Sequence, residues 1–338
     1  MKISISSSRK RGLTPDLRLV QKYLKNNIED IEFSYFMADE TSKNRMAKKG
    51  FKDAKKRYCN TVENVICVDA SIQGKKYKTG KKVLIAVPYD YQFKAVNRVE
   101  TESDYKRTNS FKGFDYIIAG SPFAKDVYTK CYNIPNSQII ENVVTPMAWN
   151  MRREKAAKDS REKYETMFPK MKGKKVIAIL TNGKVNEDEP SPYERFDLKK
   201  VLDNIDSSYF VLTNSEEILN NAITLGNEYT EKFAYINKAL DSRRILYFAE
   251  YLFTNSGMYA SYMSGRKKPV YCINYTENNF ETFMKRKFPD LYIGDLNKIT
   301  EHLKGYQDIN KRFTQYFSYV ESENPCEAVS YTHLRAHE

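Results

Sequence analysis

The sequence has few cysteines, and they are not arranged as a metal site or a disulfide framework. The five cysteines, Cys59, Cys67, Cys131, Cys272 and Cys326, lie far apart and form no CxxC pair. Closely spaced cysteines are typical of zinc sites and of small disulfide-rich domains. The spacing found here therefore indicates reduced thiols in a cytosolic protein.

Long apolar runs and an apolar N-terminal leader are also missing. A membrane-spanning helix needs roughly 18 or more consecutive apolar residues, and a secretory signal needs an apolar core followed by small residues. We therefore expect a cytoplasmic protein. Any contact with a membrane would be peripheral, on its inner face.

Histidine is scarce: the chain has only His302, His333 and His337. The last two lie in residues 329–338, VSYTHLRAHE, whose reverse translation matches a transposase-type sequencing-library adapter read in frame. We expect this adapter-derived tail not to be native and exclude it from reasoning about the fold. His302 then remains as the single native histidine.

The chain is strongly basic, with a formal net charge of +13. Such a charge indicates an anionic partner, which composition alone leaves open between nucleic acid, a membrane surface and a phosphorylated substrate. Aromatic-glycine repeats and a recognisable nucleic-acid-binding module are missing, so we expect no nucleic acid partner.

Alternating strand and helix patterns predict an α/β protein with two parallel sheets, and 338 residues suffice to bury two cores. We expect an N-terminal α/β domain over 1–146, a linker over 147–174 and a C-terminal α/β domain over 175–328. The expected strands are 2–6, 31–37, 64–68, 82–87, 114–119, 138–144, 175–180, 209–212, 233–236, 247–254 and 270–273. The expected helices include 14–26, 42–58, 121–131, 196–204, 215–222 and 258–264.

The stretch from Ala249 to Tyr275 contains the clearest candidate for a phosphate-binding site. An aromatic and apolar run ends at Asn255, Ser256 and Gly257, and a helical spacing begins at Met258. The first N–H groups of a helix lack intrahelical partners and carry partial positive charge. We therefore predict that Asn255, Ser256, Gly257 and Met258 bind a donor phosphate. An ordinary serine-capped turn would give the same pattern.

The candidate catalytic residue is Asp90, which follows the strand at 82–87 and lies among tyrosines. Open α/β sheets bind ligands at the carboxyl ends of their strands, and a partly buried carboxylate there can act as a general base. The alternative is that Asp90 caps the next turn.

Arg9, Arg11 and Lys94 are the candidate acceptor-binding residues. Arg9 and Arg11 follow the first strand, and Lys94 follows Asp90. Their side chains suit an anionic acceptor. A solvated basic turn accounts equally for the two arginines.

From about Phe114 to Ala328 the chain resembles the CDP-glycerol glycerophosphotransferases that polymerise teichoic acids and related capsule polymers. The likeness rests on the order and spacing of FDYIIAGS at 114–121, KVIAILT at 175–181, FDLKKV at 196–201, YFVL at 209–212, YLFT at 251–254, RKKPVY at 266–271 and FTQYFSY at 313–319. The resemblance implies the GT-B architecture, in which two Rossmann-like domains face each other across a cleft. Residues 1–146 would then form the Rossmann-like acceptor domain, and residues 175–328 the Rossmann-like nucleotide-donor domain. It also implies a nucleotide-activated donor, with no metal or other cofactor required.

The sequence departs from this family at its histidine motifs. The family's HGTPLK would fall on 89–94 and its RPHP on 213–216, so both expected histidines are absent. The family's phosphate-binding DYSS turn would fall on 255–258, where two hydroxyls are lost. Chemistry that depends on these histidines is therefore not expected. The scaffold and a possible phosphate site remain.

We therefore expect a GT-B-type transferase that moves a sugar or polyol phosphate from a nucleotide-activated donor to a teichoic acid or capsule-like polymer precursor. In this hypothesis the helix that starts near Ser256 stabilises the leaving diphosphate in place of a metal, and Asp90 deprotonates the acceptor hydroxyl. The acceptor would be an anionic polymer or a lipid-linked molecule. One alternative is a catalytically inactive relative that binds nucleotide or a partner enzyme, and another is a basic nucleic-acid-binding protein.

Overall fold

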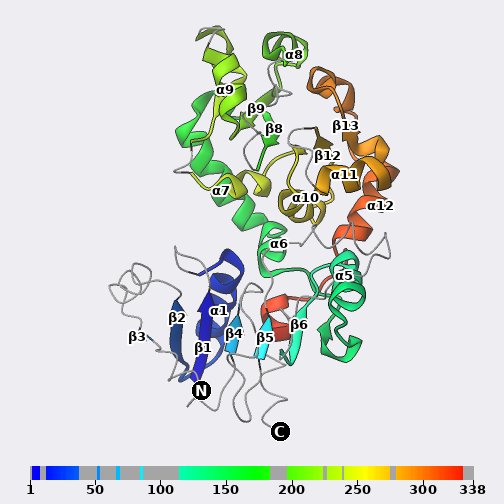
Figure 1. Ribbon diagram of the computed structural model, residues 1–338. Coiled ribbons are helices and arrows are strands. Elements are labelled where there is room, and N and C mark those ends of the chain that lie inside the picture. The colour runs from blue at the N-terminus through cyan, green and yellow to red at the C-terminus, as the bar shows by residue number, and fades with distance from the viewer. Residues whose placement is uncertain are drawn as a thin grey trace. The chain divides into compact units, whose positions relative to one another are not determined.

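The computed structural model describes residues 2–7, 13–37, 52–53, 66–68, 84–86, 114–182, 196–223, 227–237, 240–274 and 279–329. The chain divides into two compact units. The first unit is Met1–Trp149 together with Tyr319–Glu338, and the second is Asn150–Ser318. Each unit contains a parallel β-sheet with helices beside it, which confirms the predicted α/β class (Figure 1).

The sheet of the first unit has the strand order β3-β2-β1-β4-β5-β6-β7. Its strands are β1 (Lys2–Ser7), β2 (Glu32–Met37), β3 (Lys52–Asp53), β4 (Ile66–Val68), β5 (Leu84–Ala86), β6 (Tyr116–Ile118) and β7 (Ile139–Ile140). Its helices include α1 (Pro15–Asn27), α5 (Pro122–Tyr132) and η3 (Asn136–Gln138), and residues 325–329 are also helical. Helix α6 (Pro146–Met151) spans the boundary between the two units.

Helix α1 begins where the sequence predicts. The Thr14 hydroxyl caps the helix by accepting a hydrogen bond from the Leu17 N–H at 3.3 Å. The apolar stripe of α1, which includes Leu17, packs in one cluster with Ile5 of β1. Val329 is buried in the same cluster, although it is the first residue of the predicted non-native tail.

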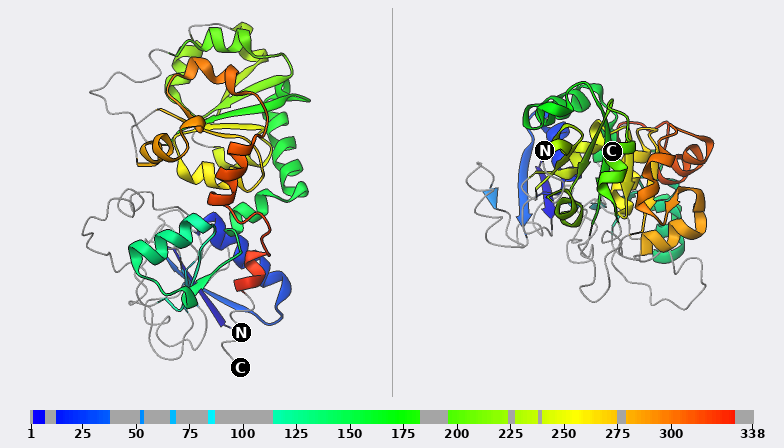
Figure 2. Two further views of the ribbon diagram at one scale, coloured as in Figure 1. Left: turned by 90° about the vertical axis from the view of Figure 1, so that its right-hand side faces the viewer. Right: turned by 90° about the horizontal axis from the view of Figure 1, so that it is seen from above.

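The sheet of the second unit has the order β10-β9-β8-β11-β12-β13. Its strands are β8 (Lys175–Leu180), β9 (Tyr209–Thr213), β10 (Phe233–Tyr235), β11 (Tyr251–Thr254), β12 (Val270–Ile273) and β13 (Tyr292–Ile293). The helices are α7 (Glu154–Met167), η4 (Pro169–Met171), α8 (Leu198–Asn204), α9 (Glu216–Ile223), η6 (Asn227–Glu231), η7 (Ser242–Tyr247), α10 (Gly257–Ser264), α11 (Asn279–Lys287), η8 (Pro289–Leu291), η9 (Leu296–His302) and α12 (Asp308–Phe317). Helices lie on both sides of these strands (Figure 2).

Both sheets have the strand order of a Rossmann fold. In each, the chain starts in the middle, adds two strands on one side and then returns to build the other side. The reversal falls between β1 and β4 in the first unit and between β8 and β11 in the second. Ligands of open α/β sheets bind at the carboxyl ends of the strands beside such a reversal. In the second sheet, the expected ligand-binding position is therefore at the carboxyl ends of β8 and β11.

The predicted linker, 147–174, is not a separate connection. It contains α7, whose Tyr164 is buried against Phe248 of the second unit, with ring centroids 5.4 Å apart. The Tyr164 hydroxyl also donates to the Asp241 carbonyl at 3.1 Å. These contacts make α7 part of the second unit, although its sequence is mostly charged.

The end of the described chain returns to the first unit instead of finishing the second. Glu323 forms an isolated parallel bridge with Val143. The Ser322 hydroxyl accepts a 2.8 Å hydrogen bond from the Val144 N–H. The last ten residues of the predicted C-terminal domain, 175–328, therefore belong to the first unit. The sequence did not predict this, because the contacts join positions far apart in the chain.

The strand predicted over 247–254 is shorter in the structure, because β11 begins at Tyr251 and Tyr247 ends η7. The guanidinium of the half-buried Arg266 accounts for the difference. It donates to the carbonyl oxygens of Leu246 and Ala249, each at 2.8 Å, and so holds a turn where the apolar run predicts a strand. This tertiary contact outweighs the local preference.

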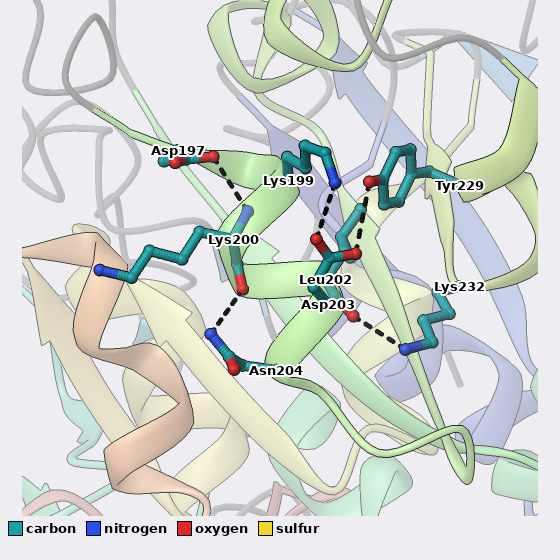
Figure 3. Close-up of polar contacts among 8 residues, drawn as sticks. All are labelled: Asp197, Lys199, Lys200, Leu202, Asp203, Asn204, Tyr229 and Lys232. Atoms are coloured by element: carbon teal, nitrogen blue, oxygen red, sulfur yellow. Dashed lines mark hydrogen bonds and ion pairs between the residues drawn. The ribbon is translucent and has the colours of Figure 1, made fainter.

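The C-terminal end of α8 is bonded to a lysine that precedes β10. Lys232 donates to the Leu202 carbonyl at 2.9 Å (Figure 3). It also donates to the Ile205 carbonyl at 2.8 Å. The last carbonyls of a helix have no intrahelical donor, so an ammonium group here stabilises the helix end. On the exposed side of α8, a hydrogen bond from Lys199 lowers the pKa of the Asp203 carboxyl group.

Candidate functional site at the carboxyl edge of the second sheet

Three neighbouring strands of the second sheet end in the dipeptide Thr-Asn. Thr181-Asn182 follows β8. Thr213 and Thr254 are the last residues of β9 and β11, and Asn214 and Asn255 follow them. The strands are parallel, with Thr213 opposite Ile179 and Thr254 opposite Leu180. The three asparagines therefore meet at the carboxyl edge of the sheet, beside the reversal in strand order.

Two of these asparagines bind the backbone after β8. Asn214 accepts from the Thr181 N–H at 2.8 Å and donates to the Thr181 carbonyl at 3.0 Å. Asn255 accepts from the Asn182 N–H at 2.8 Å and donates to the Asn182 carbonyl at 2.9 Å. A carboxamide offers one acceptor and an N–H donor, as a peptide group does. The two side chains therefore extend the sheet's hydrogen bonding by one residue on each side of β8.

The two Thr-Asn-Ser turns differ in how the serine is used. Ser215 caps α9, because its hydroxyl accepts from the Ile218 N–H at 3.3 Å. Ser256 precedes α10 in the same way, but its side chain makes no capping hydrogen bond. The first N–H groups of α10 are thus left without a side-chain cap. A ligand anion is one of the partners that can satisfy such groups.

Helix α10 is largely buried in the second unit. It packs against β11, β12, η7 and α12, and seven of its eight residues are buried. In its first turn, the Tyr259 hydroxyl lies 2.9 Å from the Ser242 hydroxyl of η7. Burial raises the pKa of Tyr259. The start of α10 is therefore fixed in place by its surroundings, as a preorganised binding site requires.

The structure places the four predicted phosphate-binding residues together at this edge. Asn255 is 1% exposed and Ser256 is 4% exposed, Gly257 is also buried, and Met258 is half-buried. Both polar groups of the Asn255 side chain are bonded to Asn182. Asn255 thus has a structural role at this edge, and phosphate binding by the turn remains a prediction.

The other predicted site residues, Asp90, Lys94, Arg9 and Arg11, lie outside the described residues. In the sequence, Arg9 and Arg11 follow β1, and Asp90 and Lys94 follow β5. Their assignment as a catalytic base and as acceptor-binding residues therefore stays a prediction.

His302 is the last residue of η9 and contacts the second sheet. Its ring packs on Tyr271, with centroids 5.1 Å apart, and Tyr271 is the second residue of β12. The neighbouring Tyr251 begins β11, and its hydroxyl accepts from the Gly305 N–H at 3.0 Å. None of the contacts described for His302 involves the three asparagines of the Thr-Asn edge.

Two features of this edge were not predicted from the sequence: the contacts of Asn214 and the position of Asn182. The signal was the dipeptide Thr-Asn, repeated at the ends of three apolar strands. Among the described residues, no group of three or more His, Cys, Asp or Glu side chains could hold a metal ion. None of the described helices is both long and apolar enough to cross a bilayer.

Comparison with known proteins identifies the fold and the family. A variant of the wall teichoic acid polymerase TagF matches with a TM-score of 0.70 and 13% identity, over 99% of this chain and 88% of that one. A putative UDP-N-acetylglucosamine 2-epimerase from Listeria monocytogenes matches with a TM-score of 0.57 and 13% identity, over 100% and 96%. The UDP-GlcNAc 2-epimerase of Methanocaldococcus jannaschii matches with a TM-score of 0.51 and 14% identity, over 99% of both chains.

At these identities the structural matches show a shared fold. No curated protein matches the sequence significantly. The family model for CDP-Glycerol:Poly(glycerophosphate) glycerophosphotransferase matches residues 2–291, which is most of the chain. This match confirms the resemblance inferred from the sequence. The chain belongs to the CDP-glycerol:poly(glycerophosphate) glycerophosphotransferase family.

Proposed function

We propose that this protein transfers glycerol phosphate from CDP-glycerol to the end of an anionic cell-surface polymer such as a teichoic acid precursor. Family membership over residues 2–291 supports the reaction class. A related structure is that of a TagF variant soaked with CDPG, which matches this chain with a TM-score of 0.68. The donor site would lie at the Thr-Asn edge of the second sheet.

In the proposed reaction, a terminal hydroxyl oxygen of the acceptor attacks the phosphorus atom that carries glycerol in CDP-glycerol. A new phosphodiester bond forms, the bond from that phosphorus to the bridging oxygen breaks, and CMP leaves. The hydroxyl proton passes to a general base, for which Asp90 is the candidate. The N–H groups at the start of α10 would stabilise the charge on the phosphates without reorganising.

The observation that carries this proposal is the uncapped start of α10 beside the reversal in strand order. At the equivalent turn before α9, Ser215 caps its helix. Before α10, Ser256 makes no capping bond, and the turn is fixed by Asn255 and by the Tyr259–Ser242 contact. A rigid turn with unused N–H donors, at the edge where parallel sheets bind ligands, suits a phosphate.

An assay of product formation tests the proposal. The purified protein is incubated with CDP-glycerol and a poly(glycerophosphate) acceptor, and CMP release and polymer length are measured. We expect CMP release that depends on the acceptor and persists in EDTA, because the proposed mechanism uses no metal. Binding of CDP-glycerol without CMP release would support the catalytically inactive relative. Absence of donor binding would refute the proposal.

Contact with an anionic membrane is a separate part of the proposal. The net charge of +13 would attract the protein to anionic headgroups and to an anionic polymer on a lipid carrier. Co-sedimentation with phosphatidylglycerol vesicles, compared with phosphatidylcholine vesicles, tests this part. Equal binding to both kinds of vesicle would contradict it.

A further inference from the structure

We propose that Asn182 is a donor-contacting residue whose side-chain carboxamide hydrogen-bonds a phosphate oxygen of the nucleotide donor. This inference rests on the proposed function and adds a residue to its site. Asn182 follows β8 directly at the carboxyl edge of the sheet. The reversal between β8 and β11 lies at this point, where open α/β sheets bind their ligands.

The backbone on both sides of Asn182 is held by asparagine side chains. Asn214 bonds the N–H and the carbonyl of Thr181, and Asn255 bonds the N–H and the carbonyl of Asn182. The hydrogen bonds are 2.8–3.0 Å long, and Asn255 is 1% exposed. With both peptide groups fixed, the direction of the Asn182 side chain from the backbone is fixed as well. A ligand would therefore meet this side chain without first ordering a loop.

Among the described residues, the Asn182 side chain has no hydrogen-bond partner, whereas its neighbours at this edge are engaged. Asn182 is exposed, and no described residue hydrogen-bonds its carboxamide. The polar groups of Asn214 and Asn255 are bonded to the backbone after β8. Asn182 thus supplies an available side-chain N–H donor at the Thr-Asn edge.

The position of Asn182 suits a phosphate in particular. Its backbone N–H lies 2.8 Å from the side-chain oxygen of Asn255, the residue that immediately precedes the Ser256 turn. In this proposal, the Asn182 carboxamide donates to a phosphate that is bound by the N–H groups at the start of α10. Hydrogen bonds to a charged acceptor are stronger than those between neutral groups.

Isothermal titration calorimetry with CDP-glycerol and with CDP tests the proposal on the full-length protein. We expect Asn182→Ala to weaken binding of both ligands about 10- to 100-fold, the range for losing one hydrogen bond to a charged group. Asn182→Asp removes the N–H donors and adds a negative charge, so its loss should be larger. Asn204→Ala and Asn204→Asp are matched controls, because Asn204 is exposed on α8 and its side chain donates to the Lys200 carbonyl of the same helix at 2.8 Å.

The outcomes separate this inference from the proposed function. If the unmodified protein binds CDP-glycerol and both Asn182 variants bind it within about twofold, the inference is wrong and the proposed function survives. If the unmodified protein binds no CDP-linked donor, the proposed function fails first. The melting temperature of Asn182→Ala should stay unchanged, because Asn255 bonds the backbone N–H and carbonyl of this residue and not its side chain. A marked drop in that temperature would also overturn the inference.

Discussion

Asp16 accepts a 2.8 Å hydrogen bond from the backbone N–H of Met147, although the two residues are 131 positions apart. The carboxylate is fully buried in the first turn of α1, and Met147 lies in the first turn of α6. One side chain thus serves the N-terminal ends of two helices, where a negative charge is favourable. The sequence identifies Asp16 only as a first-turn acid of α1.

Replacing Asp16 with alanine should destabilise the first unit. The Met147 N–H would lose its buried acceptor, which costs about 2 to 3 kcal/mol when a charged partner is removed. Urea unfolding followed by circular dichroism measures the effect, with Asp16→Asn as the control that keeps an acceptor oxygen. Equal loss in the two variants would show that the charge matters and the hydrogen bond does not.

Lys232→Met should lower stability by about 1 kcal/mol, because the carbonyls of Leu202 and Ile205 lose their donor at the end of α8. Methionine keeps most of the side-chain length, so packing changes little. Lys199→Met on the same helix is the control, since its pair with Asp203 is exposed and such pairs contribute little. Equal effects of the two substitutions would argue against capping by Lys232.

The stability of the second unit should depend on pH through His302. Burial lowers the pKa of His302 from its ordinary value of 6.5. Just below pH 6.5 the unfolded chain therefore binds more protons at this residue than the folded chain. The contribution of His302 to the free energy of unfolding is therefore fully present above pH 6.5, and it decreases as the pH falls below 6.5.

Urea unfolding between pH 5 and pH 8, on the unmodified protein and on His302→Gln, measures this dependence. The other two histidines are present in both proteins, so the difference between the curves isolates His302. Parallel curves for the two proteins would show that His302 does not contribute.

Cys272 and Cys326 should be unreactive in the folded protein. Both are buried and free, and burial raises the pKa of the Cys272 thiol well above its usual value and that of Cys326 to about 12. Thiolate is the reactive form. Iodoacetamide at pH 8 should therefore label both residues only after urea unfolding, as read by peptide mass spectrometry. Labelling of the native protein at the unfolded rate would contradict this burial.

Asp90→Asn should abolish CMP release and leave CDP-glycerol binding near that of the unmodified protein. The amide keeps the size of the side chain but cannot take up the acceptor proton. Lys94→Ala is the comparison, because it should raise the KM for the anionic acceptor more than it lowers kcat. Unchanged turnover in Asp90→Asn would remove Asp90 from the mechanism.

Much of the strand pattern could be predicted from local sequence. The boundaries of β8 (Lys175–Leu180) and β12 (Val270–Ile273) coincide with the expected strands, because each apolar run has polar or turn-forming residues on both sides. The position of the α10 turn was also predicted from its Asn-Ser-Gly break. These features depend on neighbours in the sequence.

The features that the sequence did not predict depend on distant partners. Lys52–Asp53 lies within the helix expected over 42–58, yet it forms the edge strand β3 because it pairs with Ser34 and Tyr35 of β2. Asn214 and Asn182 meet because of the register between strands that are separated in the sequence. Their hydrogen bonds cannot be inferred until the order of strands is known.

The first unit is built from two segments that are far apart in the sequence, and this has a consequence for synthesis on the ribosome. Residues 150–318 are continuous and can fold as soon as they emerge, whereas the first unit needs Cys326 and Val329 to complete a core that begins with Ile5. The apolar cluster around Ile5 therefore stays incomplete until residues 326–329 have been translated.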